Sequence, residues 1–195
     1  MKPSADPRLY EALASLNEIG SNVNRIGQDG LVSVEATLKL IVGSAIKVVP
    51  GASAVIYSYD NVKEIFLLSS RVSAGCSDVN AETDTPRING LGMRAIQQKR
   101  RVLSYEESDL TIHPVRANSG ARVMACFPLV VANSPVGVLY VYLQDERQFS
   151  QLELLMLDNF VNQAAMAIYH AHHLERMQRN LARKEDEINR MRRAG

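Results

Sequence analysis

Cysteine and tryptophan are the residues that this sequence has least of: its 195 residues contain no tryptophan and only two cysteines, Cys76 and Cys126. The cysteines lie 50 residues apart, form no CxxC pair and have no flanking histidine. This spacing argues against a disulfide-stabilised scaffold and against a zinc finger. A chain that does without disulfides suits a reduced compartment, and we expect a cytoplasmic location.

An excess of charge of one sign is also missing. Lysine and arginine number 22 against 21 acidic residues, which gives a formal net charge of +1. So weak a field gives no reason to expect binding to nucleic acid or to an anionic membrane surface. The longest unbroken apolar run, residues 136–143, falls far short of the roughly 20 residues that span a bilayer. We therefore expect neither a nucleic-acid partner nor a membrane partner.

Apolar residues recur at steps of three and four in two N-terminal segments. The first segment runs from near Pro7 to Asp29-Gly30. The second begins at Ser33 and is broken by Pro50-Gly51. This periodicity predicts two amphipathic helices ahead of the first strand.

Strand patterns occupy the middle of the chain. Residues 52–59 and 64–72 read as an antiparallel hairpin, and residues 122–131 and 136–143 as a second one, because each connection is short. A short helix at 93–99 and a short strand at 101–105 lie between them, flanked by two irregular segments, 73–86 and 106–120. The second hairpin is almost continuously apolar, which predicts a sheet that is covered on both faces.

The last helix has the clearest local signal. Ser150 and Glu153 form a capping box, and Phe149 is placed to pack onto Leu154. No proline or glycine follows until the end of the chain, so the helix is expected to run from Gln151 to about Arg193, or roughly 60 Å. One globular domain cannot cover that length.

The second half of this helix carries a heptad pattern. Leu174, Leu181 and Ile188 occupy a positions, and Met177, Lys184 and Met191 occupy d positions, which predicts a coiled-coil seam. Three heptads are few and Lys184 weakens the seam, so a solvated helix that frays is the alternative. We expect residues 1–30 to join this helix in a dimer bundle, residues 31–172 to form one domain, and residues 173–195 to lead to an output domain. The expected dimer interface comprises Leu9, Leu13, Leu16, Leu174, Met177, Leu181 and Ile188.

The order of these elements resembles a GAF domain over residues 30–172. The similarity is carried by PGASAVIY at 50–57, GLGMRAI at 90–96, PVGVLYVY at 135–142, and FSQLELL and NQAAMAI at 149–155 and 162–168. The resemblance implies an α+β fold with a central antiparallel sheet of about six strands. It also implies helices on one face that include both chain ends, and a small-molecule pocket on the other face.

Known ligand classes of this family fit the sequence poorly. Bilin-binding members attach the chromophore to a cysteine typically followed by histidine, whereas Ser77 follows Cys76 and Phe127 follows Cys126, so a covalent bilin is not expected. The NKFDE pattern of cyclic-nucleotide members is incomplete at residues 61–66. Free methionine sulfoxide reductases of this fold need three cysteines. Haem or iron would depend on His113 and is not favoured.

The candidate ligand-binding residues are taken from topology: Tyr57, Arg94, His113, Arg122 and Cys126. Amide groups at Gly90-Leu91-Gly92 could hold an anion with help from Arg94, Arg116 or Arg122, or the glycines could simply form a tight turn. No metal site and no catalytic motif is expected. The sequence leaves the cofactor and the ligand unidentified.

The resemblance implies a sensory module of a bacterial-type signalling protein. Such a module would be homodimeric through its first and last helices and joined to an output domain such as a histidine kinase. Two alternatives stay open. One is a structural dimerisation module whose pocket is filled by its own side chains, such as Tyr57, Met93, Met124 and Phe127; the other, less favoured, is a small redox enzyme using Cys76 or Cys126.

Overall fold

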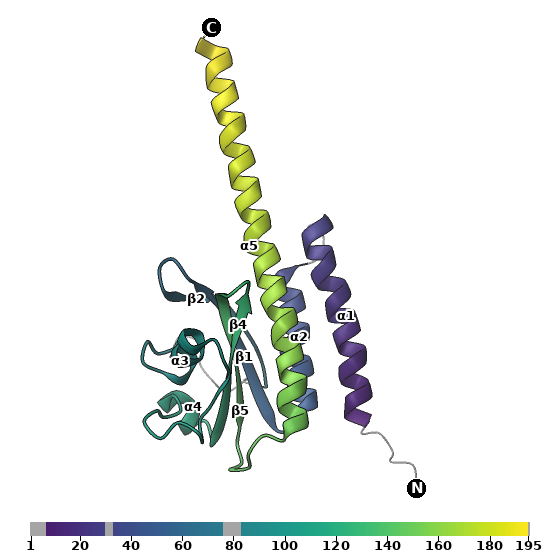
Figure 1. The fold of residues 1–195 in the computed structure, drawn as a ribbon, viewed down its shortest axis with the longest axis vertical. Helices are drawn as coiled ribbons and strands as arrows, with labels where there is room; N and C mark the ends of the chain where they lie inside the picture. The colour runs from purple at the N-terminus through teal and green to yellow at the C-terminus, as the bar shows by residue number, and fades with distance from the viewer. Residues whose placement is uncertain (1–6, 30–32, 76–82, 195) are drawn as a thin grey trace.

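The computed structural model describes residues 7–29, 33–75 and 83–194 as one α+β domain with a long C-terminal helix (Figure 1). In chain order the elements are α1 (Pro7–Asp29), α2 (Val34–Val48), β1 (Ala52–Asp60), β2 (Ile65–Ala74), α3 (Leu91–Gln98), β3 (Val102–Leu103), α4 (Pro114–Asn118), β4 (Val123–Val131), β5 (Ser134–Leu143) and α5 (Gln151–Ala194).

Local signals set the helix boundaries close to where the sequence predicted them. Ser33 caps α2, because its hydroxyl accepts a hydrogen bond from the amide of Ala36 at 3.4 Å. After α2, Gly51 adopts a left-handed conformation with φ of 77°, which turns the chain into β1. The short helix α4 was not predicted, since five residues are too few to show a helical period.

The sheet is antiparallel throughout, with strand order β2-β1-β5-β4-β3. The family resemblance implied about six strands, and the described residues form five. β3 is only two residues long because the chain turns away at once: the amide of Glu106 donates to the carbonyl of Leu103 at 3.0 Å. The long segment that follows therefore lies off the sheet.

The second hairpin is tighter than predicted. Its turn consists of Ala132 and Asn133 alone, with φ of 47° and 66°, so β5 begins at Ser134 and not at Val136. Positive φ at both turn residues matches the right-handed twist of antiparallel strands. Pro135 is accommodated opposite Val130, beside an irregularity in the β4–β5 register.

The sheet is buried on both faces, as the apolar strands predicted. Ile56 and Leu139 pack into a core shared with α1, α2 and α5, whereas Tyr57 and Tyr140, their neighbours in β1 and β5, belong to a second core with α3. Figure 1 shows the three long helices on one side of the sheet and α3 and α4 on the other. Alternation of side chains along each strand thus separates a helix face from a pocket face.

Helix α5 begins with the predicted capping box. The amide of Ser150 donates to Glu153 Oε2 at 2.7 Å, and the amide of Glu153 donates to Ser150 Oγ at 3.2 Å. α1 runs parallel to α5 (Figure 1), with His170 Nδ1 only 3.2 Å from the carbonyl oxygen of Val23. Past the end of α1, α5 projects alone away from the domain. No described helix is both long and apolar enough to span a bilayer.

Two glycines give a matched test of this packing. A methyl group at Gly137 in β5 would lie 2.6 Å from the carbonyl oxygen of Tyr57, whereas one at Gly43 in α2 meets nothing within 4 Å. Gly137→Ala should lower the free energy of unfolding by roughly 1–3 kcal/mol. Gly43→Ala should raise it by about 0.5–1 kcal/mol, because alanine favours the helix. Urea denaturation measures both, and similar effects at the two sites would contradict the strand packing.

Candidate functional site

The pocket face holds a small cavity of about 20 Å³ next to the middle of the sheet. Tyr57, Tyr140 and Tyr142 line it from β1 and β5, Asp84 and neighbouring residues line it from the segment before α3, and His113 lines it from the start of α4. A cavity of this size has room for about one water molecule. Side chains of the domain itself therefore fill most of the pocket.

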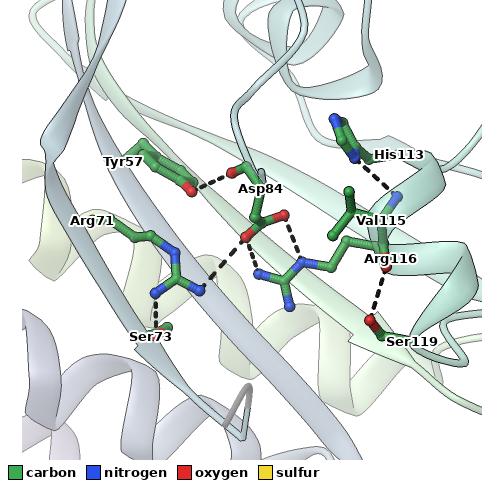
Figure 2. A network of polar contacts seen from close by, with 8 residues as sticks. All are labelled: Tyr57, Arg71, Ser73, Asp84, His113, Val115, Arg116 and Ser119. Atoms are coloured by element: carbon green, nitrogen blue, oxygen red, sulfur yellow. Dashed lines mark hydrogen bonds and ion pairs between the residues drawn. The ribbon is translucent and has the colours of Figure 1, made fainter. Parts of the chain in front are cut away.

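A buried ion pair joins the two irregular segments over this face. Arg116 Nε donates to Asp84 Oδ1 at 2.8 Å, and Arg116 Nη2 donates to Asp84 Oδ2, so the pairing is bidentate (Figure 2). The side chains of Arg116 and Asp84 are only 2% and 5% exposed. The guanidinium also lies 4.6 Å from the centre of the Tyr142 ring, a cation–π contact.

A second arginine approaches the same carboxylate from β2. Arg71 Nη2 lies 3.6 Å from Asp84 Oδ2, and Arg71 Nη1 donates to Ser73 Oγ at 3.0 Å. In Figure 2 the Asp84 carboxylate lies between the two guanidinium groups. We refer to these three residues as the Arg71–Asp84–Arg116 cluster. It combines two cations with one anion.

The tyrosines of the pocket are protonated hydrogen-bond donors. Tyr57 Oη donates to the carbonyl oxygen of Asp84 at 2.5 Å. Burial, followed by the nearby Asp84 charge, raises the pKa of Tyr57 to about 12. Burial also raises the pKa of Tyr140 and of Tyr142 well above the ordinary value. The pocket therefore presents neutral phenols beside a charged cluster.

His113 has a structural role at the start of α4. Its Nδ1 accepts a hydrogen bond from the amide of Val115 at 3.3 Å, and Pro114 follows at the first helical position. Burial and then the charge of Arg87 lower the pKa of His113, so the imidazole is neutral at pH 7. Within the described ranges, no group of three His, Cys, Asp or Glu residues is placed to hold a metal ion.

Of the five candidate ligand-binding residues, the structure places Tyr57 and His113 on the cavity. Arg94 lies on α3 outside the cavity wall, where it pairs with Asp109 at 2.7 Å and with Glu107. Arg122 is exposed at the start of β4. Cys126 is fully buried beneath the tyrosines, and burial raises the pKa of its thiol. Cys76 lies outside the described residues.

No sequence pattern pointed to Arg71 or Asp84, and Arg116 was considered only as one of three arginines that could help to bind an anion. Asp84 and Arg116 lie in segments without periodicity, so no spacing rule links them. Tyr140 and Tyr142 could have been found, because they share a strand face in the apolar β5 segment. Gly92 has a packing role, since a methyl group there would overlap the Tyr140 ring.

The architecture is that of a sheet with its terminal helices on one face and a small polar pocket on the other, and solved structures share it. The GAF domain of a phosphoenolpyruvate-protein phosphotransferase from Coxiella burnetii matches with a TM-score of 0.68 at 15% identity, covering 87% of this chain and 99% of that one. The equivalent domain from Acinetobacter gives 0.64 at 19% identity, with coverages of 85% and 98%. A GAF domain of a two-component sensor histidine kinase from Bacillus halodurans gives 0.59 at 14% identity, with coverages of 73% and 98%.

The sequence agrees with this architecture. The family model of the GAF domain matches residues 32–168, and the chain therefore belongs to the GAF domain family. A search of curated proteins finds no significant match. The structural similarities, all under 25% identity, establish the fold, and this chain's own residues must decide what the pocket does.

The buried ion pair predicts a strong and specific effect on stability. Asp84→Asn should lower the free energy of unfolding by about 3–5 kcal/mol, because it removes the charge of a buried carboxylate that makes a bidentate pair with the Arg116 guanidinium. Asp109→Asn is the matched control: this carboxylate also pairs with an arginine but is 61% exposed, and its loss should cost about 0–1 kcal/mol. Equal losses in guanidinium denaturation would contradict the burial of the Asp84 pair.

The tyrosines predict an alkaline limit to stability. Because the pKa of Tyr57 is raised from 10.0 to about 12 in the folded state, its contribution is fully present below pH 10 and is lost as the pH rises through 12. The free energy of unfolding should therefore fall above pH 10. Tyr57→Phe should make that fall shallower, and parallel pH curves for the two proteins would show that Tyr57 is not involved.

Proposed function

We propose that this GAF domain is a cytoplasmic sensory module that binds a small molecule in its pocket. In this proposal it transmits the state of the pocket through a homodimeric helical bundle to an output domain such as a histidine kinase. The observation that carries the proposal is a stripe of exposed apolar side chains along α5, interrupted by polar residues such as Asn159, Asn162 and Lys184. A lone copy of the chain leaves this stripe in water.

The stripe runs along one side of α5 from the domain into its projecting half. Its members are the large apolar residues of α5 that remain exposed: Leu152, Leu155, Met166, Tyr169, Met177, Leu181, Ile188 and Met191. At about 100° of rotation per residue, they fall within an arc of about 120°. Leu157, Phe160 and Ile168, which pack into the domain core, lie on the opposite side.

A second copy of this chain is the occupant that we assign to the stripe. The stripe merges into the heptad seam, whose members Met177, Leu181 and Ile188 are 48–59% exposed. Leu13 on α1 is similarly exposed. Leu16 and Leu174 instead pack in part against the core of their own chain, so they would flank the interface. The side chain of Leu9 lies outside the described residues.

A physical connection leads from the pocket to this helix. β5 presents Tyr140 to the pocket and Leu139 to the helix face. Gly137, in the same strand, lies close to Ile168 of α5, because a methyl group there would be 3.4 Å from Ile168 Cδ1. A ligand that favours one position of β5 would therefore favour one packing of α5, as two-state signalling requires.

The output domain is an inference by analogy. GAF domains of sensor histidine kinases share the fold, and the proposal needs such a domain in addition to these 195 residues. It assigns no catalytic step to this chain. Cys126, the cysteine within the described residues, is inaccessible and has a raised thiol pKa.

A structural homodimerisation module without a ligand is the second candidate. It is favoured by the filled pocket, whose cavity measures about 20 Å³. Native mass spectrometry of the freshly purified protein, compared with its denatured mass, separates the two candidates. A dimer with additional non-covalent mass supports the sensor. A dimer with no additional mass, either as purified or after metabolites are added, supports the structural module.

Replacing one residue of the stripe tests the dimer itself. Leu181→Asp should convert the dimer to a monomer without loss of stability of the domain, because Leu181 is 59% exposed within the chain. Ala182→Asp is the control, since it introduces the same charge one position outside the seam and should leave a dimer. Sedimentation velocity measures both masses. A Leu181→Asp dimer would place the interface elsewhere.

A further inference from the structure

Arg71 is the least satisfied member of the Arg71–Asp84–Arg116 cluster. Asp84 and Arg116 satisfy each other through a bidentate pair, which leaves the charge of Arg71 with only a partial partner. Arg71 Nη2 lies 3.6 Å from Asp84 Oδ2, which is too far for a hydrogen bond. In ranges 7–29, 33–75 and 83–194, Asp84 is the one carboxylate that pairs with Arg71.

The unsatisfied atoms of Arg71 form the edge of the guanidinium that binds oxyanions. Nε and Nη2 are both buried and have no hydrogen-bond partner, while Nη1 is used by Ser73. Nε and Nη2 donate in parallel, and this fork matches the two oxygens of a carboxylate or phosphate. Two buried donors without acceptors are costly, so a group that accepts from both would be bound favourably.

We propose that the Nε–Nη2 edge of Arg71 binds the oxyanion group, a carboxylate or a phosphate, of the small molecule that the pocket senses. This inference rests on the proposed sensory function and names the class of its ligand. The ligand oxygens would accept from Nε and Nη2 of Arg71, and Asp84 would stay paired with Arg116. Arg71 would then have an anionic partner that accepts from both donors.

The position also agrees with the size and access of the site. The cavity admits about one water molecule, so a larger group must take space near its rim. Arg71 does not line this cavity but lies next to two residues that do, Tyr57 and Asp84 (Figure 2), and its side chain is 16% exposed. Arg71 also lines a separate hollow of about 250 Å³ with Ser58, Ser69 and Ser70.

Thermal unfolding in the presence of simple anions tests the proposal. Sodium acetate and sodium phosphate are the probes, and sodium chloride at equal ionic strength is the baseline. With a dissociation constant on the order of 1 mM for so small a ligand, about 100 mM of the favoured anion should raise Tm by roughly 5–10 °C. A response to acetate identifies a carboxylate ligand, and a response to phosphate identifies a phosphate.

Variants decide whether Arg71 is responsible. Arg71→Lys keeps the charge but lacks the two-donor edge, so binding should weaken at least about tenfold. Arg122→Gln, which removes an exposed arginine, should respond like the unmodified chain. No Tm shift in the unmodified chain, or an equal shift in Arg71→Lys, would overturn the proposal.

Two further measurements cover the remaining outcomes. If Arg71→Lys does not fold, the Nε–H resonances of the arginines in the unmodified chain replace it: a saturable shift at Arg71 supports the proposal, and shifts only at exposed arginines overturn it. Sedimentation of the same samples tests the proposed function separately. A dimer whose Tm changes with neither anion overturns the oxyanion assignment alone. A monomer whose Tm rises in a way that depends on Arg71 supports the assignment and contradicts dimeric signalling.

Discussion

Burial of the central strands on both faces is the constraint on which the rest of this structure depends. The side chains of β1, β5 and β4 alternate between two apolar cores along most of each strand, so neighbouring residues such as Leu139 and Tyr140 lie on different sides of the sheet. One core receives the three long helices and the other receives the pocket. Because both cores share the same strands, neither can be repacked without moving the backbone of the other. This shared sheet gives a GAF domain a physical means of linking a pocket to a helix.

On the pocket face, an ion pair holds the irregular segments in place. The segments before α3 and around α4 have little regular structure, and the Asp84–Arg116 pair fixes one against the other. The cost of burying these charges is offset by bidentate geometry and by the Tyr142 ring. Arg71 is the member with donors, Nε and Nη2, that have no hydrogen-bond acceptor. The same cluster therefore holds two segments together and is the strongest candidate for ligand recognition.

Helix α5 combines two environments in one continuous element. Its capping box fixes where it begins, and its inner face, including Phe160 and Ile168, completes the domain core. Its outer face carries exposed apolar residues from the domain into the projecting half. In the proposed dimer, the inner face of α5 would contact the sheet and its outer face would contact the second copy, so small shifts of the sheet would change how the helices pack.

Local patterns in the chain were sufficient to predict the order of the elements, both hairpins, the capping box at Ser150 and the length of α5. They failed where structure is not periodic: α4 was missed, and β3 and the β4–β5 turn were misplaced by a few residues. They also placed only Tyr57 and His113 on the cavity. The periodicity of apolar residues predicts which side of one segment faces the core. Capping residues predict only interactions within a few positions of a helix end. The meeting of Arg71, Asp84 and Arg116 depends instead on contacts between three segments far apart in the chain, which no local pattern encodes.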